Sequence, residues 1–153
     1  MMFTEEELTK RLANVVAEFE KREEISAFYL FGSYATGCPK PTSDVDLAIL
    51  LSVADRETYL DKRLNLMAEI AMIIGIDNLD VLILNEASVD LAYRVLREGK
   101  LLYLKKGAEK QLVRFKVRVF DQYCDYQPVR KLFSAALGKR IKEGNFGGRQ
   151  GKS

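Results

Sequence analysis

Two short apolar runs separated by a polar turn constrain the fold of this chain most strongly. Residues 25–31 read ISAFYLF and residues 44–51 read DVDLAILL. Apolar, aromatic and β-branched runs of this length, bounded by turn-forming residues, are typical of buried strands. The sequence LDVLIL at residues 79–84 predicts a third strand, and residues 101–104 predict a short fourth. We therefore expect a central β-sheet.

Amphipathic segments alternate with these strands. The spacing of their apolar residues predicts helices over about residues 4–22, 60–75 and 88–97. The pattern is helical again from about 108 to 142, but Pro128 predicts an interruption there, because proline cannot continue a helix interior. The order of elements predicts an α/β (or α+β) fold with a mixed central sheet, helices mainly on one side and a C-terminal helix pair.

The length of 153 residues fits a single domain. We expect this domain to span residues 1–142, with a core at about 25–104, basic helices at about 107–142 and a flexible Gly-rich tail at 143–153.

Charge is distributed unevenly along the chain. Residues 1–104 carry 11 Lys and Arg against 18 Asp and Glu, whereas residues 105–153 carry 13 against 4. The basic part fits either a solvated helix surface or a surface for an acidic partner or a polyphosphate.

Composition limits the chemistry that this chain can perform. It contains no histidine, which excludes Ser-His-Asp and Cys-His triads and histidine-ligated zinc. Cys38 and Cys124 lack metal-ligand spacing and are expected to be free thiols in a reducing cytoplasm. No apolar run is long enough to cross a bilayer, and the acidic start does not resemble a signal peptide, so we expect a cytoplasmic protein without a membrane partner.

Acidic residues open two of the predicted strands. Asp44 and Asp46 are two positions apart, so their side chains share one face of a strand. They either lie in water at the start of the strand or need a cation between them, because adjacent carboxylates repel. Asp80 opens the next strand and adds a third carboxylate if the strands pair, with Asp77 in the preceding turn as the alternative. Such oxygen ligands suit Mg²⁺, and one of the carboxylates could instead act as a base.

Gly32 and Ser33 directly follow the first strand. Glycine lets a backbone approach a phosphate closely, and Ser33 is expected to begin a short helix whose N–H groups favour an anion. The pair alone is equally typical of an ordinary helix N-cap, so its significance depends on its fixed distance from the carboxylates.

The spacing resembles the signature of the polymerase β-like nucleotidyltransferase superfamily, which is Gly-Ser, ten residues and Asp-x-Asp. The resemblance implies Mg²⁺-dependent nucleotidyl transfer with two metal ions. It places Ser33 near the β- and γ-phosphates of a nucleoside triphosphate, with Gly32 also in the nucleotide-binding site. It implies that the catalytic and metal-binding residues are Asp44, Asp46 and Asp80. Many relatives carry a basic residue where this chain has Thr36, so a triphosphate contact is expected instead from Lys40 or from the basic helices.

Longer stretches, including LFGSYATG, SDVDLAIL and LDVLILNEA, resemble the MntA-type antitoxins, which are minimal nucleotidyltransferases encoded beside HEPN-domain toxins. The similarity covers roughly residues 27–130. It implies a protein adenylyltransferase that transfers AMP from ATP to a tyrosine of its partner, a HEPN RNase toxin, and thereby neutralises it. The alternatives are an antitoxin that acts by binding alone and a nucleotidyltransferase that acts on an RNA end or a small molecule. Direct nucleic-acid binding is not otherwise expected.

Overall fold

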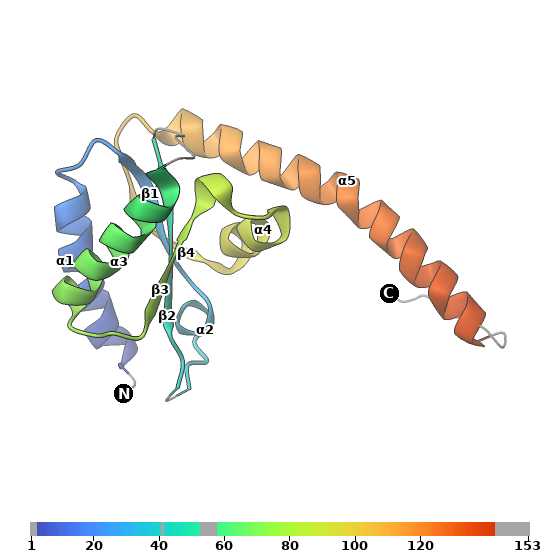
Figure 1. Cartoon of the computed structure of the whole chain (residues 1–153), viewed down its shortest axis with the longest axis horizontal. Coiled ribbons are helices and arrows are strands. Elements are labelled where there is room, and N and C mark those ends of the chain that lie inside the picture. Colours follow the sequence, from blue (N-terminus) through green and yellow to red (C-terminus); the bar gives the residue numbers. More distant parts are fainter. Residues whose placement is uncertain (1–2, 41, 53–57, 143–153) are drawn as a thin grey trace. The chain divides into compact units, whose positions relative to one another are not determined.

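The computed structural model describes residues 3–40, 42–52 and 58–142. The elements, in chain order, are α1 (Glu5–Phe19), β1 (Ile25–Phe31), α2 (Ser33–Thr36), β2 (Val45–Leu51), α3 (Tyr59–Ile74), β3 (Leu79–Ile83), the 3₁₀ turn η2 (Leu84–Glu86), α4 (Val89–Glu98), β4 (Lys100–Leu104) and α5 (Glu109–Lys142) (Figure 1).

The four strands form one mixed sheet in the order β3-β2-β1-β4. β1 pairs antiparallel with β2 and with β4, whereas β2 and β3 run parallel. All seven residues of β1 are buried, and all but Ser26 are apolar or aromatic. The predicted α/β class with a mixed central sheet is confirmed.

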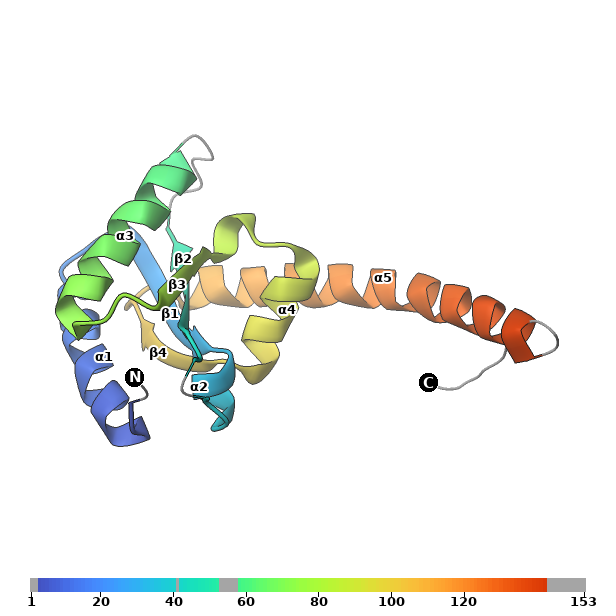
Figure 2. The same cartoon turned by 60° about the horizontal axis from the view of Figure 1, so that its bottom comes forward.

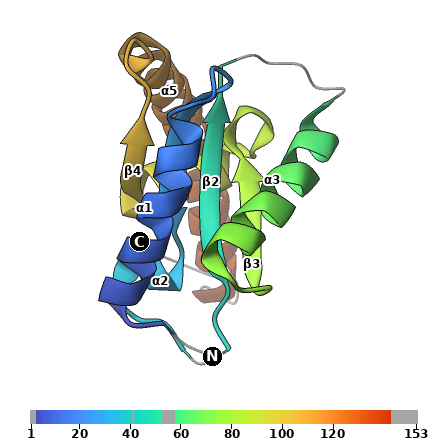
Figure 3. The ribbon, with the colours of Figure 1, turned by 90° about the vertical axis from the view of Figure 1, so that its left-hand side faces the viewer.

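Helices α1 and α3 cover one face of the sheet (Figure 3). Thr4 caps α1 by accepting a hydrogen bond from the backbone N–H of Glu7 at 3.1 Å. The apolar stripe of α1 packs on the sheet, and Phe19 meets Phe28 of β1 edge-to-face with ring centroids 4.9 Å apart. These contacts make this side the larger part of the hydrophobic core.

Helix α4 lies on the opposite face of the sheet (Figure 2). Its buried residues are Ala92 and Val95. The first turns of α5 are joined to the sheet through Gln111. The Ser26 hydroxyl donates to Gln111 Oε1 at 2.6 Å, and Gln111 Nε2 donates to the Leu51 carbonyl at 2.9 Å. The sheet is therefore covered on both faces, with α1 and α3 supplying the larger layer.

The expected C-terminal helix pair is wrong, because α5 continues through Pro128 as one helix of 34 residues. Proline removes one main-chain donor at a cost of about 3 kcal/mol, which the hydrogen bonds of the flanking turns can offset. The chain divides within α5 into two compact units, residues 1–116 and 117–153. The predicted tail at 143–153 lies outside the described residues, and the single-domain boundaries stay a prediction.

Cys38 and Cys124 are both free and exposed, as expected. In the part of the chain that the structure describes, every helix is too short or too polar to cross a bilayer.

Candidate active site

The strands that carry two of the predicted aspartates lie side by side. In the parallel register of β2 and β3, Asp46 lies opposite Asp80. Their neighbours Leu47 and Val81 are buried in the core beneath α1 and α3. Because side chains alternate along a strand, both carboxylates project from the other face of the sheet. The pairing on which the prediction for Asp80 depended is therefore present.

Asp44 lies one residue before β2, which begins at Val45 and not at Asp44 as predicted. Asn78 holds this entry to the strand from two directions. The backbone N–H of Val45 donates to the Asn78 carbonyl at 3.0 Å, and Asn78 Nδ2 donates to the Ser43 carbonyl at 3.1 Å. These bonds flank Asp44, so its backbone is fixed while its side chain stays exposed.

Gly32 brings the backbone into close approach with Asp46. It has φ +76°, and a Cβ atom at this position would lie 2.2 Å from Asp46 Oδ2. Both the positive φ and the missing side chain are therefore required. Ser33 begins α2, as predicted. Since α2 has only four residues, its N–H groups rather than a helix dipole would attract an anion.

The three aspartates act on one another electrostatically. Burial raises the pKa of the Asp46 carboxyl above its ordinary value, and the negative charges of Asp80 and Asp44 raise this pKa further. The positive charge of Arg94 on α4 opposes the increase. Charges perturb a carboxyl in this way when they lie close to it. A cation bound among these side chains would therefore relieve an existing repulsion.

The chemistry of these ligands suits Mg²⁺, which takes one or two carboxylates from a protein and its other ligands from water and substrate phosphates. Among the described residues, no group of three or more acidic or cysteine side chains is arranged to hold a metal ion. Asp44 and Asp46 therefore fit an open half-site that phosphate oxygens would complete, and do not form a closed protein cage.

Asp80 is held by an arginine that the sequence did not single out. Arg63 of α3 donates from Nη2 to Asp80 Oδ1 at 2.9 Å and from Nε to the Val81 carbonyl at 2.7 Å. Arg63, Asn78 and Arg94 were all missed, because a lone polar residue on a helix or in a turn has no signal that distinguishes it from a solvated one. Their proximity to the aspartates becomes visible only once β2 and β3 are paired in the structure.

The remaining sequence candidates lie in turns. Asp77, the alternative to Asp80, precedes β3, and its carbonyl accepts a hydrogen bond from the Leu79 N–H at 3.0 Å. The register with Asp46 favours Asp80 as the third carboxylate. Lys40 is exposed after α2, where its N–H donates to the Ser43 hydroxyl at 2.8 Å. Its contact with a triphosphate stays a prediction.

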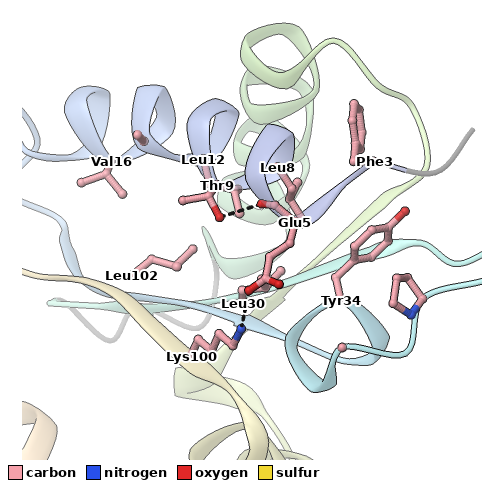
Figure 4. A pocket seen from close by; sticks show the side chains of 13 residues that line it. Phe3, Glu5, Leu8, Thr9, Leu12, Val16, Leu30, Tyr34, Lys100 and Leu102 are labelled. Atoms are coloured by element: carbon pink, nitrogen blue, oxygen red, sulfur yellow. Dashed lines mark hydrogen bonds and ion pairs between the residues drawn. The ribbon is translucent and has the colours of Figure 1, made fainter.

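An apolar groove of about 480 Å³ lies between α1 and β4 (Figure 4). Lys100 and Glu5 form an ion pair across it at 3.6 Å, and Tyr34 of α2 lines it. None of the three aspartates lines this groove. The carboxylates lie on the other face of the sheet, so the groove and the candidate active site are separate features.

Comparisons with known proteins fit this arrangement. The family described as Polymerase beta, Nucleotidyltransferase matches residues 13–108. The protein adenylyltransferase MntA of Aphanizomenon flos-aquae is 32% identical over 108 residues, which cover 67% of this chain and 71% of that protein. The MntA of Shewanella oneidensis is 32% identical over 107 residues, which cover 70% of this chain and 72% of that protein.

Solved structures show the same similarity. A crystal structure described as a toxin-antitoxin with AMP-PNP matches with a TM-score of 0.59 and 26% identity, covering 86% of this chain and 95% of that chain. An MntA–HpeT toxin-antitoxin variant with two aspartates changed to glutamate matches with a TM-score of 0.59, 25% identity and the same coverage.

The matched family region contains the whole sheet and every site residue predicted from the sequence, from Gly32 to Asp80. It spans more than half of the chain, and the relatives agree with it. This chain is therefore a nucleotidyltransferase that belongs to the polymerase β family.

Proposed function

We propose that this nucleotidyltransferase transfers AMP from ATP to a tyrosine of a HEPN-domain RNase toxin encoded with it, and so acts as its antitoxin in the cytoplasm. The relatives at 32% identity are named protein adenylyltransferases. The match at 26% identity is a toxin-antitoxin with AMP-PNP, an analogue of ATP. These names suggest both the nucleotide and the kind of acceptor.

The observation that carries the proposal is the position of the Asp46 carboxyl. It lies against the backbone of Gly32, opposite Asp80 and within the field of Asp44. A nucleotidyl transfer needs a phosphate-binding backbone beside ligands for a divalent cation. The closeness of the Gly32 backbone to the Asp46 carboxyl therefore supports the proposal.

In the proposed reaction the tyrosine oxygen attacks the α-phosphorus of ATP, the bond to the bridging oxygen breaks, and pyrophosphate leaves. Two Mg²⁺ ions, when bound, would neutralise charge on the phosphates and on the attacking and leaving oxygens. Asp44 and Asp46 would hold these ions. Asp80 would complete the metal site, align the acceptor and take the proton of the tyrosine hydroxyl, because the chain has no histidine to serve as base.

The nucleotide would be held mainly by backbone. The N–H groups at Gly32 and Ser33 would bind the β- and γ-phosphates, and Lys40 would add a positive charge. No separate module for an acceptor is evident in the described residues, so the acceptor would be delivered on the surface of the toxin.

The test is intact-mass spectrometry of the HEPN protein encoded beside this chain, after incubation with the chain, ATP and Mg²⁺. We expect an increase equal to one or more adenylyl groups, located on tyrosine by peptide mapping. The double variant Asp44→Ala/Asp46→Ala should give none. Asp77→Ala is the matched control, because it removes a carboxylate of the same kind from the turn before β3.

Other outcomes would redirect the assignment. A stable complex and a silenced toxin without added mass would replace transfer by neutralisation through binding alone. Neither complex nor added mass would leave RNA ends and small molecules as the acceptors to test. Full transfer by the double variant would refute the site itself.

A further inference from the structure

We infer that Arg63 is a positioning residue that orients the Asp80 carboxylate toward the cation and the acceptor. This inference rests on the proposed function, because it names a residue that orients one of the carboxylates of the same site. It comes from a contact that no part of the proposed reaction requires. Arg63 belongs to α3, whereas Asp80 projects from the opposite face of the sheet.

The contact is possible because β3 is an edge strand. Among the described residues β3 pairs with β2 on one side only, so alternate carbonyls point outward from its other side. Arg63 reaches over this edge and donates from Nε to the Val81 carbonyl at 2.7 Å. Its Nη2 then reaches Asp80 Oδ1 at 2.9 Å. One side chain therefore fixes a backbone group and a carboxylate at the same time.

This two-point attachment restricts a side chain that would otherwise move. The Asp80 side chain is 54% exposed and the Arg63 side chain 37% exposed, so packing alone does not fix the carboxylate. A planar guanidinium bound through Nε and Nη2 has a defined orientation. It contacts Oδ1 of Asp80, so Oδ2 remains as the oxygen that a cation or an acceptor proton can use.

The adjacent residue provides a matched control. Lys62 is also on α3, forms an ion pair with Glu24 at 3.0 Å, and has a side chain 36% exposed. Its partner lies before β1, away from the three aspartates. Lys62→Met therefore removes one charge and one ion pair from the same helix without touching Asp80.

The first measurement is the affinity of the full chain for Mn²⁺ in the presence of AMP-PNP, detected by electron paramagnetic resonance. We expect Arg63→Met to weaken Mn²⁺ binding by about tenfold or more relative to Lys62→Met, the usual effect of losing a residue that orients a metal ligand. Arg63→Lys keeps the positive charge, but an ammonium group lacks the planar pair of donors that bind the Val81 carbonyl and the Asp80 carboxylate together. It should therefore restore only part of the lost Mn²⁺ affinity. Thermal unfolding by circular dichroism should show both methionine variants folded, with similar midpoints.

The second measurement is adenylyl transfer to the toxin as a function of Mg²⁺ concentration. Arg63→Met should raise the half-saturating Mg²⁺ concentration and lower kcat, whereas Lys62→Met should match the wild type. Equal Mn²⁺ affinity in the two methionine variants would overturn the inference. Tighter binding by Arg63→Met would also overturn it, since the arginine would then compete with the cation.

Failure of the proposed function would look different. If Mn²⁺ binding depends on Arg63 but the wild type modifies no toxin, the positioning role stands and the acceptor is wrong. If the wild type binds no Mn²⁺ with AMP-PNP, both proposals fail.

Discussion

Replacing Gly32 by alanine tests the closest approach in the candidate site. Gly32 has φ +76° and ψ −158°, a region that is almost restricted to glycine. The added Cβ would lie 2.2 Å from Asp46 Oδ2 and 3.0 Å from Asp46 Cγ. Alanine therefore meets two obstacles, which are the backbone conformation and the carboxylate.

The costs of these two obstacles add. The backbone conformation costs about 1–3 kcal/mol for a residue with a side chain. Rotating Asp46 away from its preferred rotamer adds about 0.5–1.5 kcal/mol. Gly32→Ala should therefore lower the free energy of unfolding by about 1.5–4.5 kcal/mol. It should also displace a proposed metal ligand and so reduce nucleotidyl transfer.

Gly37→Ala gives the cost of a positive φ without a steric contact, because Gly37 has φ +79° and a Cβ atom added there would meet nothing within 4 Å. Its cost should be about 1–2 kcal/mol, from the backbone alone. Urea unfolding followed by circular dichroism gives both values. In an Asp46→Ala background the cost of Gly32→Ala should fall, since the two nearest atoms, Asp46 Oδ2 and Cγ, are then absent. A Gly32→Ala cost equal to that of Gly37→Ala, or unchanged in that background, would refute the reasoning.

Three further predictions concern the fold around the site. Without metal, Asp46→Asn should raise the free energy of unfolding at neutral pH, because the raised pKa of Asp46 means that its ionised form destabilises the folded state. The gain should vanish as the pH falls to 3.8, the ordinary pKa of an aspartate side chain. Urea unfolding in EDTA at both pH values checks this, and a gain that persists in acid contradicts it. Phe28→Ala should cost about 3–5 kcal/mol in the same assay, because Phe28 is fully buried against Phe19, and a loss below about 1 kcal/mol would show that the core rearranges. Ser26→Ala should cost about 1 kcal/mol and speed amide exchange at the start of α5, since it removes the hydrogen bond to Gln111; unchanged exchange would show that this bond does not secure the helix.

The sheet and the motif were predictable because each depends on local sequence. Apolar runs mark β1 and β2, and a fixed spacing joins Gly32 to Asp44 and Asp46. The structure places Asp80 opposite Asp46, as the pattern of a strand opened by an acid suggested.

The unpredicted features depend on distance in space or on small energy differences. Arg63 and Asn78 meet the site only after α3 and β3 have packed, and neither stands in a recognisable motif. The break expected at Pro128 did not occur, since the cost of one interior proline is finite and does not forbid a helix. Asp44 lies outside β2 because hydrogen bonds to Asn78, and not hydrophobicity, determine where the strand begins.

The parallel register of β2 and β3 links the activity of this enzyme to the correct folding of its sheet. Leu47 and Val81 enter the core while Asp46 and Asp80 leave it, so a slip of one residue in either strand would bury a carboxylate and expose an apolar side chain. The same slip would separate the two carboxylates onto opposite faces of the sheet. A chain with mispaired strands would therefore be both unstable and inactive. Nucleotidyl transfer would thus indicate that β2 and β3 are correctly paired.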